Sequence, residues 1–284
     1  MAQTRLVIAT RKSPLAMVQT EMVKALLERS IAHCEVELLP LTTIGDERLK
    51  WSLELEGGKG LFTSELEQAI LDGRADLAVH SSKDLPTDMD TGLALAGFLE
   101  RASAHDVLIR RAGVPLLKKV ATASPRRRAQ LAQRLPGLEW TEIRGNVGTR
   151  LRKITEGHAD ATLLAAAGLS RLGITSYEGL LFEPLSIEAS VPAAGQGAIA
   201  IQCRVGETER FAPIVCEETG LAVRCERTVL AAMGGGCHSA TAAHWVDGVL
   251  HVFDESFGYQ RLELPTGLFA VGELEQLITA WKSV

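Results

Sequence analysis

An aspartate stands in a short loop that follows an apolar run. The run at 76–80 leads into Ser-Ser-Lys-Asp at 81–84, and Pro86 then ends any regular structure. A carboxylate fixed at the end of a strand can carry protons or stabilise a cation on a bound ligand. Asp84 is therefore a candidate catalytic residue, although a Lys-Asp-x-Pro loop is also typical of a solvated turn.

A second group of candidates consists of arginines in one third of the chain. They are Arg126, Arg127, Arg128, Arg144, Arg150, Arg152 and Arg171. The net charge of -5 argues against a nucleic-acid partner. Guanidinium forks in an acidic protein instead suggest a small polyanionic ligand, because each fork can hold a carboxylate with two parallel hydrogen bonds. A salt-bridged surface is the alternative that composition leaves open.

Two of these arginines flank a glycine-containing turn. The segment 143–150 reads IRGNVGTR, and we expect a strand at 139–143 to lead through it into a helix that begins near Val147. Gly145 and Gly148 would let backbone amides approach a ligand oxygen. The coincidence of glycines, helix start and arginines favours an anion site over a plain loop.

Two further candidates lie in other glycine-rich turns. Lys59 lies in GGKG at 57–60, ahead of an expected helix, and Cys237 follows three glycines that leave its thiol accessible for covalent attachment. A free cysteine in a flexible loop explains Cys237 equally well. The five cysteines lack CxxC spacing, so a reducing cytoplasm is expected, with neither disulfides nor a metal site.

These residues need a scaffold, and hydrophobic periodicity predicts one in the first hundred residues. Ser13 and Pro14 start a helix that ends near Leu27, and Ser64 and Glu67 have capping-box spacing. The second helix stops at Gly73. The expected strands are 5–10, 36–41, 76–80 and 93–97.

The same pattern then recurs. Residues 119–125 lead from an expected strand through Ser-Pro into a helix, as residues 9–14 do. Residues 157–161 repeat the Gly-x-Ala-Asp pattern of 73–77 that precedes a strand. The sequence predicts an α/β protein with two similar doubly wound lobes, each with a parallel sheet, and a small α+β C-terminal domain. We expect the first lobe at 1–98 and 196–216, the second at 99–195 and the third domain at 217–284.

Connecting and terminal segments complete this prediction. Residues 190–197 form a small-residue connector into a strand at 198–202, which returns the chain to the first lobe. The third domain is expected to hold a helix at 220–233, a hairpin around Asp247-Gly248 and a helix at 271–281. No apolar run is long enough to span a bilayer, and the N-terminus does not resemble a signal peptide.

Eight motifs taken together resemble one family. ATRKSPLA, TIGD, GGKGLF, DLAVHSSKDLP, RGNVGTRL, AAAGLSRLG, VPAAGQGA and GGGC occur in the order typical of porphobilinogen deaminases, also called hydroxymethylbilane synthases. The resemblance extends from Arg5 to Cys237, and the last 47 residues carry little of it.

The resemblance implies a transferase that joins four porphobilinogen units into hydroxymethylbilane with loss of ammonia. It implies a dipyrromethane cofactor bound covalently through Cys237, catalysis by Asp84, and a cytoplasmic monomer without nucleic-acid or membrane partners. The cofactor contacts it implies are Lys59, Lys83, Ser124, Arg126, Arg127 and Arg144. The substrate contacts it implies are Arg11, Ser13, Gln19, Arg144, Arg150 and Arg171.

The chain departs from the family pattern near two of these residues. Leu55 replaces a usual lysine, and after Cys237 come His238 and, at the position of a usual proline, Ala240. These changes bear on how the cysteine loop packs. A non-catalytic two-lobe binding protein for a small polycarboxylate is the rival prediction. A nucleotide-binding loop is disfavoured, because no Ser or Thr follows Lys59.

Overall fold

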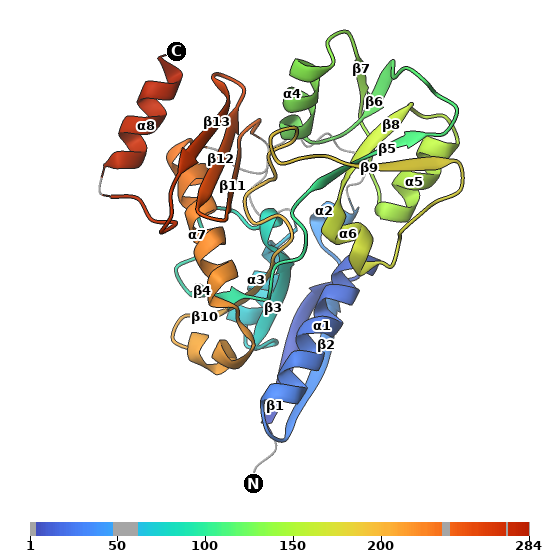
Figure 1. Ribbon diagram of the computed structural model, residues 1–284. Helices are drawn as coiled ribbons and strands as arrows, with labels where there is room; N and C mark the ends of the chain where they lie inside the picture. The colour runs from blue at the N-terminus through green and yellow to red at the C-terminus, as the bar shows by residue number, and fades with distance from the viewer. Residues whose placement is uncertain (1–3, 48–61, 235–238, 271, 284) are drawn as a thin grey trace. The chain divides into compact units, whose positions relative to one another are not determined.

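The computed structural model describes residues 4–47, 62–234, 239–270 and 272–283. The chain folds into two compact units (Figure 1). The first unit comprises residues 1–102 and 198–220, and the second comprises 103–197 and 221–284.

The first unit is built on a five-stranded sheet of order β2-β1-β3-β10-β4. Its strands are β1 (Thr4–Arg11), β2 (Cys34–Leu41), β3 (Leu77–Ser81), β4 (Leu93–Phe98) and β10 (Ile199–Arg204). β1 runs parallel to β2 and β3, whereas β10 runs antiparallel to β3 and β4. The helices are α1 (Pro14–Ser30), α2 (Ile44–Glu47), α3 (Ser64–Leu71) and the short 3-10 turns η1 (Ser82–Asp84) and η2 (Thr208–Ile214).

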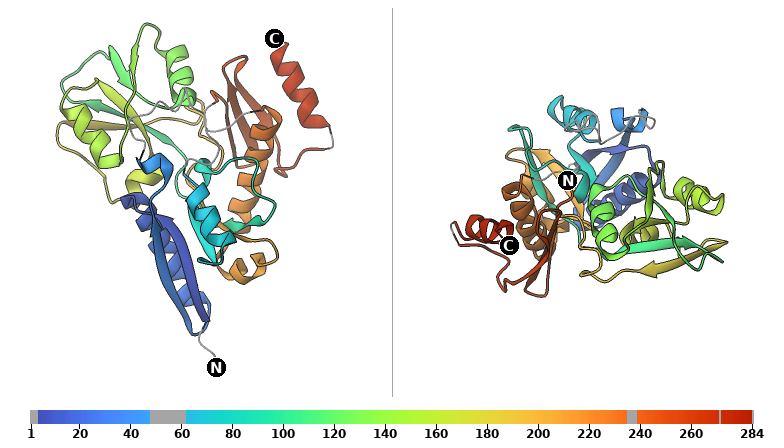
Figure 2. Two further views of the ribbon diagram at one scale, coloured as in Figure 1. Left: turned by 180° about the vertical axis from the view of Figure 1, so that it is seen from behind. Right: turned by 90° about the horizontal axis from the view of Figure 1, so that it is seen from above.

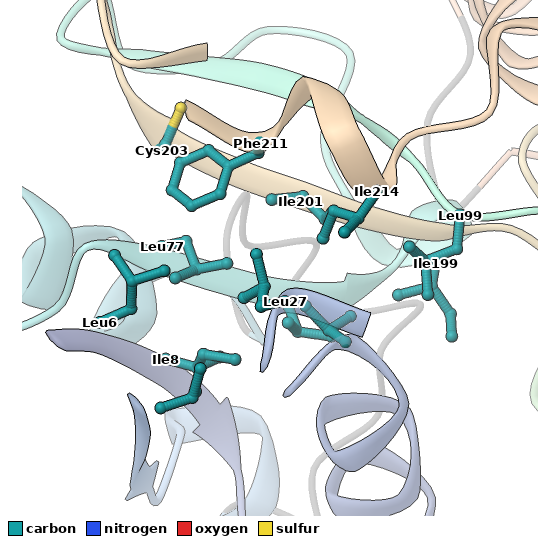
Figure 3. Close-up of a cluster of buried hydrophobic side chains, with 13 residues drawn as sticks. Leu6, Ile8, Leu27, Leu77, Leu99, Ile199, Ile201, Cys203, Phe211 and Ile214 are labelled. Atoms are coloured by element: carbon teal, nitrogen blue, oxygen red, sulfur yellow. The ribbon is translucent and has the colours of Figure 1, made fainter. Parts of the chain in front are cut away.

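Helices cover both faces of this sheet. α1 lies along β1 and β2 (Figures 1 and 2) and contributes Leu27 to a core that also holds Ile8 and, from η2, Phe211 (Figure 3). α3 packs on the opposite face, where Leu66 meets Ala78 of β3. Apolar side chains buried this completely contribute about 1.5–3 kcal/mol each, so β3, which is buried on both faces, is fixed firmly between its neighbours.

The second unit repeats this plan with the order β7-β6-β8-β5-β9. Its strands are β5 (Asp106–Arg111), β6 (Lys119–Ala121), β7 (Glu139–Thr141), β8 (Ala161–Ala165) and β9 (Leu180–Pro184). α4 (Pro125–Arg134) packs on one face, and α5 (Val147–Thr155) and α6 (Ala166–Arg171) pack on the other. The predicted duplication of an αβ unit with helices on both faces of each sheet is confirmed.

The prediction that each sheet is wholly parallel is wrong. β5 runs antiparallel to β8 and β9, as β10 does to its neighbours. β5 and β10 each begin just after the chain passes from one unit to the other, at 102/103 and 197/198. A strand entered directly from a crossing has no preceding helix to reverse the chain, so it joins its sheet antiparallel.

The remaining elements form a small α+β part, which belongs to the second unit from residue 221 onward. α7 (Glu217–Ala232) and α8 (Glu273–Lys282) share a core with the sheet β11 (Ala242–Val246), β12 (Val249–Asp254) and β13 (Gly258–Glu263). Asp247 and Gly248 have φ of 51° and 74°, as a tight hairpin turn requires. The predicted fold class, two α/β lobes with a small α+β part, is confirmed.

One local prediction is wrong. The N-cap of α3 is Thr63 rather than Ser64, and the side chain of Thr63 makes no capping hydrogen bond. The carbonyl of Thr63 accepts from the backbone N–H groups of Leu66 and Glu67 at 3.0 and 2.9 Å, so the helix turns one residue earlier than predicted. The carboxylate of Glu67 accepts instead from Gln202 at 3.1 Å.

Candidate active site

Asp84 is the last residue of η1, directly after the central strand β3. The turn is fixed by two backbone hydrogen bonds, from Ser82 N–H to the Ala198 carbonyl at 3.0 Å and from Leu85 N–H to the Ser82 carbonyl at 3.2 Å. The half-buried carboxylate of Asp84 has no hydrogen bond or ion pair within the described part of the chain. It is therefore available to a ligand.

The residues around this turn hold it from α1. The amide of the buried Gln19 pairs with the hydroxyl of Ser81 at 2.9–3.0 Å. Ser13 caps α1, since its hydroxyl accepts from Ala16 N–H at 3.3 Å. Gln19 thus fixes Ser81, three residues before Asp84, and Ser13 fixes the start of α1. The roles of both residues toward substrate stay predictions.

Two cationic side chains, Arg11 and Lys83, lie in the same lobe as Asp84, at or just after the carboxyl end of a strand. The guanidinium of Arg11, the last residue of β1, lies 4.3 Å from the ring centre of Phe62, which orients it by a cation–π contact. Lys83 is half-buried in η1 beside Asp84. Both residues are cationic side chains at the carboxyl ends of neighbouring strands, where ligands of α/β sheets bind.

A neutral histidine precedes the turn. Burial, with a smaller contribution from the charge of Arg11, lowers the pKa of His80 to about 4, although a hydrogen bond with Gln202 opposes this shift. His80 Nε2 lies 3.0 Å from Gln202 Oε1, and Gln202 Nε2 donates to Glu67 at 3.1 Å. This buried chain of polar groups links β3, β10 and α3 behind the Asp84 turn.

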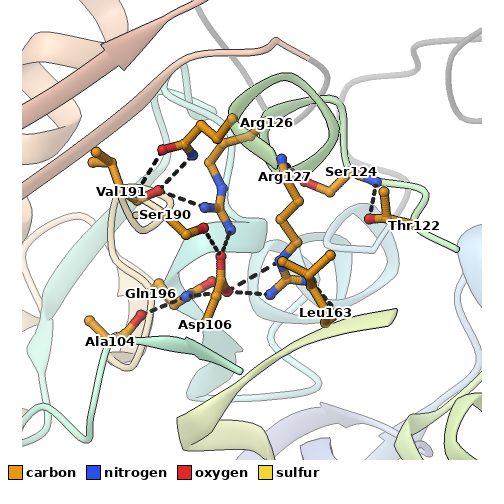
Figure 4. A network of polar contacts seen from close by, with 11 residues as sticks. Ala104, Asp106, Thr122, Ser124, Arg126, Arg127, Leu163, Ser190, Val191 and Gln196 are labelled. Atoms are coloured by element: carbon orange, nitrogen blue, oxygen red, sulfur yellow. Dashed lines mark hydrogen bonds and ion pairs between the residues drawn. The ribbon is translucent and has the colours of Figure 1, made fainter. Parts of the chain in front are cut away.

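In the second unit, Arg126 and Arg127 lie in the first turn of α4, which Ser124 caps by accepting from Arg127 N–H at 3.4 Å. The two arginines are only 5% and 7% exposed. Both guanidinium groups point to the carboxylate of Asp106 (Figure 4), at 2.8 Å from Arg126 and 2.7 Å from Arg127. The structure thus brings two of the predicted cofactor contacts, Arg126 and Arg127, together around the carboxylate of Asp106.

The charges of the two arginines strongly affect the pKa of the Asp106 carboxylate. Burial would raise the pKa of Asp106, but the charges of Arg126 and Arg127, with hydrogen bonds from Arg127 and Gln196, hold it far below its ordinary value. Burial lowers the pKa of Arg126, an effect that the charge of Asp106 opposes. The carboxylate is therefore ionised throughout the physiological range.

The glycine turn before α5 has the predicted form. Gly145 has φ of 111°, and a Cβ there would lie 2.9 Å from Thr149 Cγ2. Asn146 caps the helix by accepting from Thr149 N–H at 2.9 Å, which leaves the amides of the first turn, at 147–148, without intrahelical acceptors. The side chain of Arg150 folds back on this turn, with Nε donating to the Gly145 carbonyl at 2.7 Å.

Two predicted arginines carry buried donors without acceptors. Nη2 of Arg144 and Nε of Arg171 are buried and lack hydrogen-bond partners among the described residues. Arg144 Nε donates to Glu142 at 3.2 Å, and Arg171 Nη2 donates to the Gly197 carbonyl at 2.6 Å. Burial lowers the pKa of Arg171. Because an unsatisfied buried donor costs about 1–3 kcal/mol, both positions favour an incoming anion.

Two predicted site residues, Lys59 and Cys237, lie outside the described residues, as do Leu55 and His238. Their roles stay predictions.

Comparison with known proteins decides the family. Residues 6–211 match the family model described as "Porphobilinogen deaminase, dipyromethane cofactor binding domain". The chain belongs to the porphobilinogen deaminase family. The porphobilinogen deaminase of Paraburkholderia phytofirmans is 45% identical over 257 residues, covering 87% of this chain and 74% of the relative. That of Geobacter sulfurreducens is 46% identical over 253 residues, covering 86% and 78%.

Solved structures outside the family are more distant. The effector-binding domain of BenM with benzoate is 15% identical, with a TM-score of 0.46 over 82% of this chain and 95% of that chain. The aliphatic sulphonate binding protein SsuA from Escherichia coli is 15% identical, with a TM-score of 0.44 over 82% and 71%. Within the described ranges, every helix is too short or too polar to cross a membrane.

Asp106 is the main residue that sequence reasoning missed in this porphobilinogen deaminase-family chain. The sequence does contain a signal, since Asp106 directly precedes the apolar run Val107–Ile109 and so begins a buried strand. A carboxylate at such a position must be paired, but the sequence does not tell which of the arginines and lysines around it, at 101, 110–111, 118–119 or 126–128, supply the partners.

Proposed function

We propose that this protein is a hydroxymethylbilane synthase, a transferase that joins four porphobilinogen units head to tail with release of ammonia. The observation that carries the proposal is the family match over residues 6–211, which spans the Asp84 turn and all the described arginine sites. Relatives named porphobilinogen deaminase at about 45% identity over most of the chain support it.

The chemistry at Asp84 follows from its surroundings. Loss of ammonia from porphobilinogen leaves an electron-poor pyrrole cation, and a carboxylate near the ring N–H stabilises that charge. The same carboxylate can accept the proton that the attacking pyrrole ring loses from its bond-forming carbon when that ring regains aromaticity. Neither carboxylate oxygen of Asp84 is bonded to a described residue, so this side chain can serve both roles.

The arginines supply the ligand's counter-charges. Each pyrrole of the substrate carries two carboxylates, so a growing chain accumulates negative charge with every unit added. Arg144 and Arg171 offer buried, unpartnered donors, and Arg150 and the α5 amides form a second cationic corner. Guanidinium forks hold carboxylates in a fixed geometry that lysines do not provide.

These residues also fit a dipyrromethane primer, whose carboxylates require the same kind of donor. When bound, the primer supplies the pyrrole carbon to which the first substrate unit adds. We assign its carboxylates to Lys83, Ser124, Arg126, Arg127 and Arg144, and its thioether link to Cys237. The three successive glycines at 234–236 that precede Cys237 in the sequence, together with the family resemblance, support the link.

Denaturing mass spectrometry tests the attachment without relying on turnover. Protein from a tetrapyrrole-producing host should carry the extra mass of two linked pyrrole units, and Cys237→Ser should carry none. A bare polypeptide mass in the wild type would contradict the attachment. If the wild type binds porphobilinogen and releases no ammonia, the chain is a polycarboxylate-binding protein instead.

We further propose a cytoplasmic monomer. All four cysteines in the described part of the chain, Cys34, Cys203, Cys216 and Cys225, are free thiols, as expected in a reducing compartment. Light scattering should give the monomer mass of 30.6 kDa, and a mass twice that value would contradict the proposal.

A further inference from the structure

The carboxylate of Asp106 is fully buried at the start of β5 and is saturated with hydrogen bonds. Its Oδ1 accepts from Arg127 Nε and Nη2 at 3.2 and 2.7 Å and from Gln196 Nε2 at 2.9 Å. Its Oδ2 accepts from Arg126 Nη2 at 2.8 Å and Ser190 Oγ at 2.9 Å. No freedom remains for this carboxylate to bind a ligand itself.

The two guanidinium groups are held on a second side by backbone carbonyls. Arg126 Nη1 donates to Val191 at 2.6 Å, and Arg127 Nη1 donates to Leu163 at 3.0 Å (Figure 4). Gln130, one turn further along α4, bonds both the N–H and the carbonyl of Val191, at 2.7 and 3.1 Å. The connector at 190–197 is thereby fastened around the start of α4.

This arrangement leaves both arginines with unused donors. A guanidinium can donate five hydrogen bonds. Arg126 makes two and Arg127 three within the described structure. Each therefore keeps donors for a further acceptor, in an orientation that the Asp106 carboxylate and the carbonyls impose.

The net charge of the cluster also favours a further acceptor. Two buried guanidinium groups face one buried carboxylate, so the cluster retains one uncompensated positive charge. A buried charge without a counter-ion is costly, which favours a further anion here. Removing Asp106 would double the uncompensated charge and release both side chains from their fixed directions.

From this geometry we propose that Asp106 is a positioning residue for ligand carboxylates, acting through Arg126 and Arg127. The inference rests on the proposed function, because it takes pyrrole carboxylates as the ligand. Asp106 touches no ligand. It fixes the direction of the two forks and leaves the cluster one positive charge away from neutrality, so that one carboxylate completes it.

The main test is Asp106→Asn in the full chain, with Asp160→Asn as the matched control. Asp160 is a carboxylate of the same lobe that pairs with Arg111 at 3.2 Å and, in the described structure, is bonded to neither Arg126 nor Arg127. Steady-state KM for porphobilinogen and the fraction of chains carrying the two-pyrrole mass are measured. We expect Asp106→Asn to raise KM or lower that fraction by about 10-fold or more, and Asp160→Asn to change either by less than about 2-fold.

A double-mutant cycle separates positioning from general stability. If Asp106 acts through its neighbour, Asp106→Asn should add less than about 2-fold to the loss in kcat/KM caused by Arg127→Gln alone. Effects that multiply, or a drop in thermal midpoint with unchanged KM and unchanged two-pyrrole mass, would overturn the inference.

Ser190→Ala is a second variant, for the case in which Asp106→Asn fails to fold. It removes one hydrogen bond to Oδ2 and leaves both ion pairs; we expect a KM increase of about 3-fold or more, and an unchanged KM overturns the proposal. Ammonia release by the wild type tests the proposed function separately. If the wild type releases ammonia and Asp106→Asn has an unchanged KM and two-pyrrole mass, only the positioning role is refuted.

Discussion

The two lobes share one sheet plan and carry different chemistry at matching places. Ser13 caps α1 and Ser124 caps α4, and a proline follows each. The next two residues are Leu-Ala at 15–16 in the first lobe and Arg-Arg at 126–127 in the second. The same helix start therefore carries apolar side chains in one lobe and guanidinium groups in the other.

At the ends of the matching strands β3 and β8, the charged residues are instead in the first lobe. Strand register matches Leu77 of β3 with Ala161 of β8, since each begins its strand's pairing with the parallel neighbour, β1 in the first lobe and β6 in the second. The segment that follows is Ser-Ser-Lys-Asp at 81–84 in the first lobe and Ala-Ala-Ala-Gly at 165–168 in the second. The carboxylate thus belongs to one lobe and the buried arginine pair to the other. A duplicated scaffold fixes positions, and the residues after each strand assign the chemistry.

The largest expected effect comes from removing the carboxylate of the first lobe. Asp84→Asn keeps the size of the side chain and abolishes its charge and proton acceptance, so turnover should fall by about 10²–10⁴-fold. Ammonia release from porphobilinogen measures it. The control is Asp88→Asn, an exposed carboxylate of the same loop, which should stay near the wild-type rate. Near-normal turnover of Asp84→Asn would remove this residue from catalysis.

Much of the scaffold could be predicted because local signals and burial agree. Ser-Pro at 13–14 and 124–125 starts a helix in both lobes, and the apolar run at 77–80 could only be a buried strand. The strand direction of β5 and β10 could not be predicted, because periodicity is the same for parallel and antiparallel strands. It depends on where the chain crosses between units, which is a tertiary property.

The site was predicted less completely for a related reason. Motif residues such as Asp84 and Arg144 have recognisable neighbours in sequence, whereas Asp106 is defined by partners that are 20, 21, 84 and 90 positions away. The capping box at Ser64 failed because Glu67 has a long-range partner in Gln202. Local spacing does not report such competition.

The buried histidine offers a second contrast, since His80 of β3 corresponds by register to Leu164 of β8. Burial lowers the pKa of His80 from 6.5 to about 4, so between these values the unfolded chain binds more protons. Its contribution to stability is therefore full above pH 6.5 and is lost as pH falls to 4. His80→Gln should make the free energy of unfolding less pH-dependent by roughly 2–3 kcal/mol. Urea unfolding at pH 7 and pH 4.5 measures this, and identical pH dependence in both proteins would contradict it.

The arginines of the second lobe can be tested against one another. Arg171→Met removes a buried donor that awaits an acceptor, so kcat/KM for porphobilinogen should fall about 10–100-fold, the loss expected for hydrogen bonds to a charged group. Arg152→Gln is the control, because its side chain is 57% exposed and pairs with Glu156 on the helix surface. Equal effects in both variants would mean that burial does not distinguish ligand-binding from surface arginines.

The smallest effect should separate two glycines of one turn in the second lobe. Gly145→Ala places a Cβ at φ of 111° and 2.9 Å from Thr149 Cγ2, and should lower the free energy of unfolding by about 1–2 kcal/mol. Gly148→Ala meets nothing closer than 3.8 Å inside α5 and should raise it by up to about 1 kcal/mol. Urea unfolding of both variants measures the difference in sign. Stabilisation by both substitutions would show that α5 can begin without the left-handed residue that holds Arg144 and Arg150 about its N-terminus.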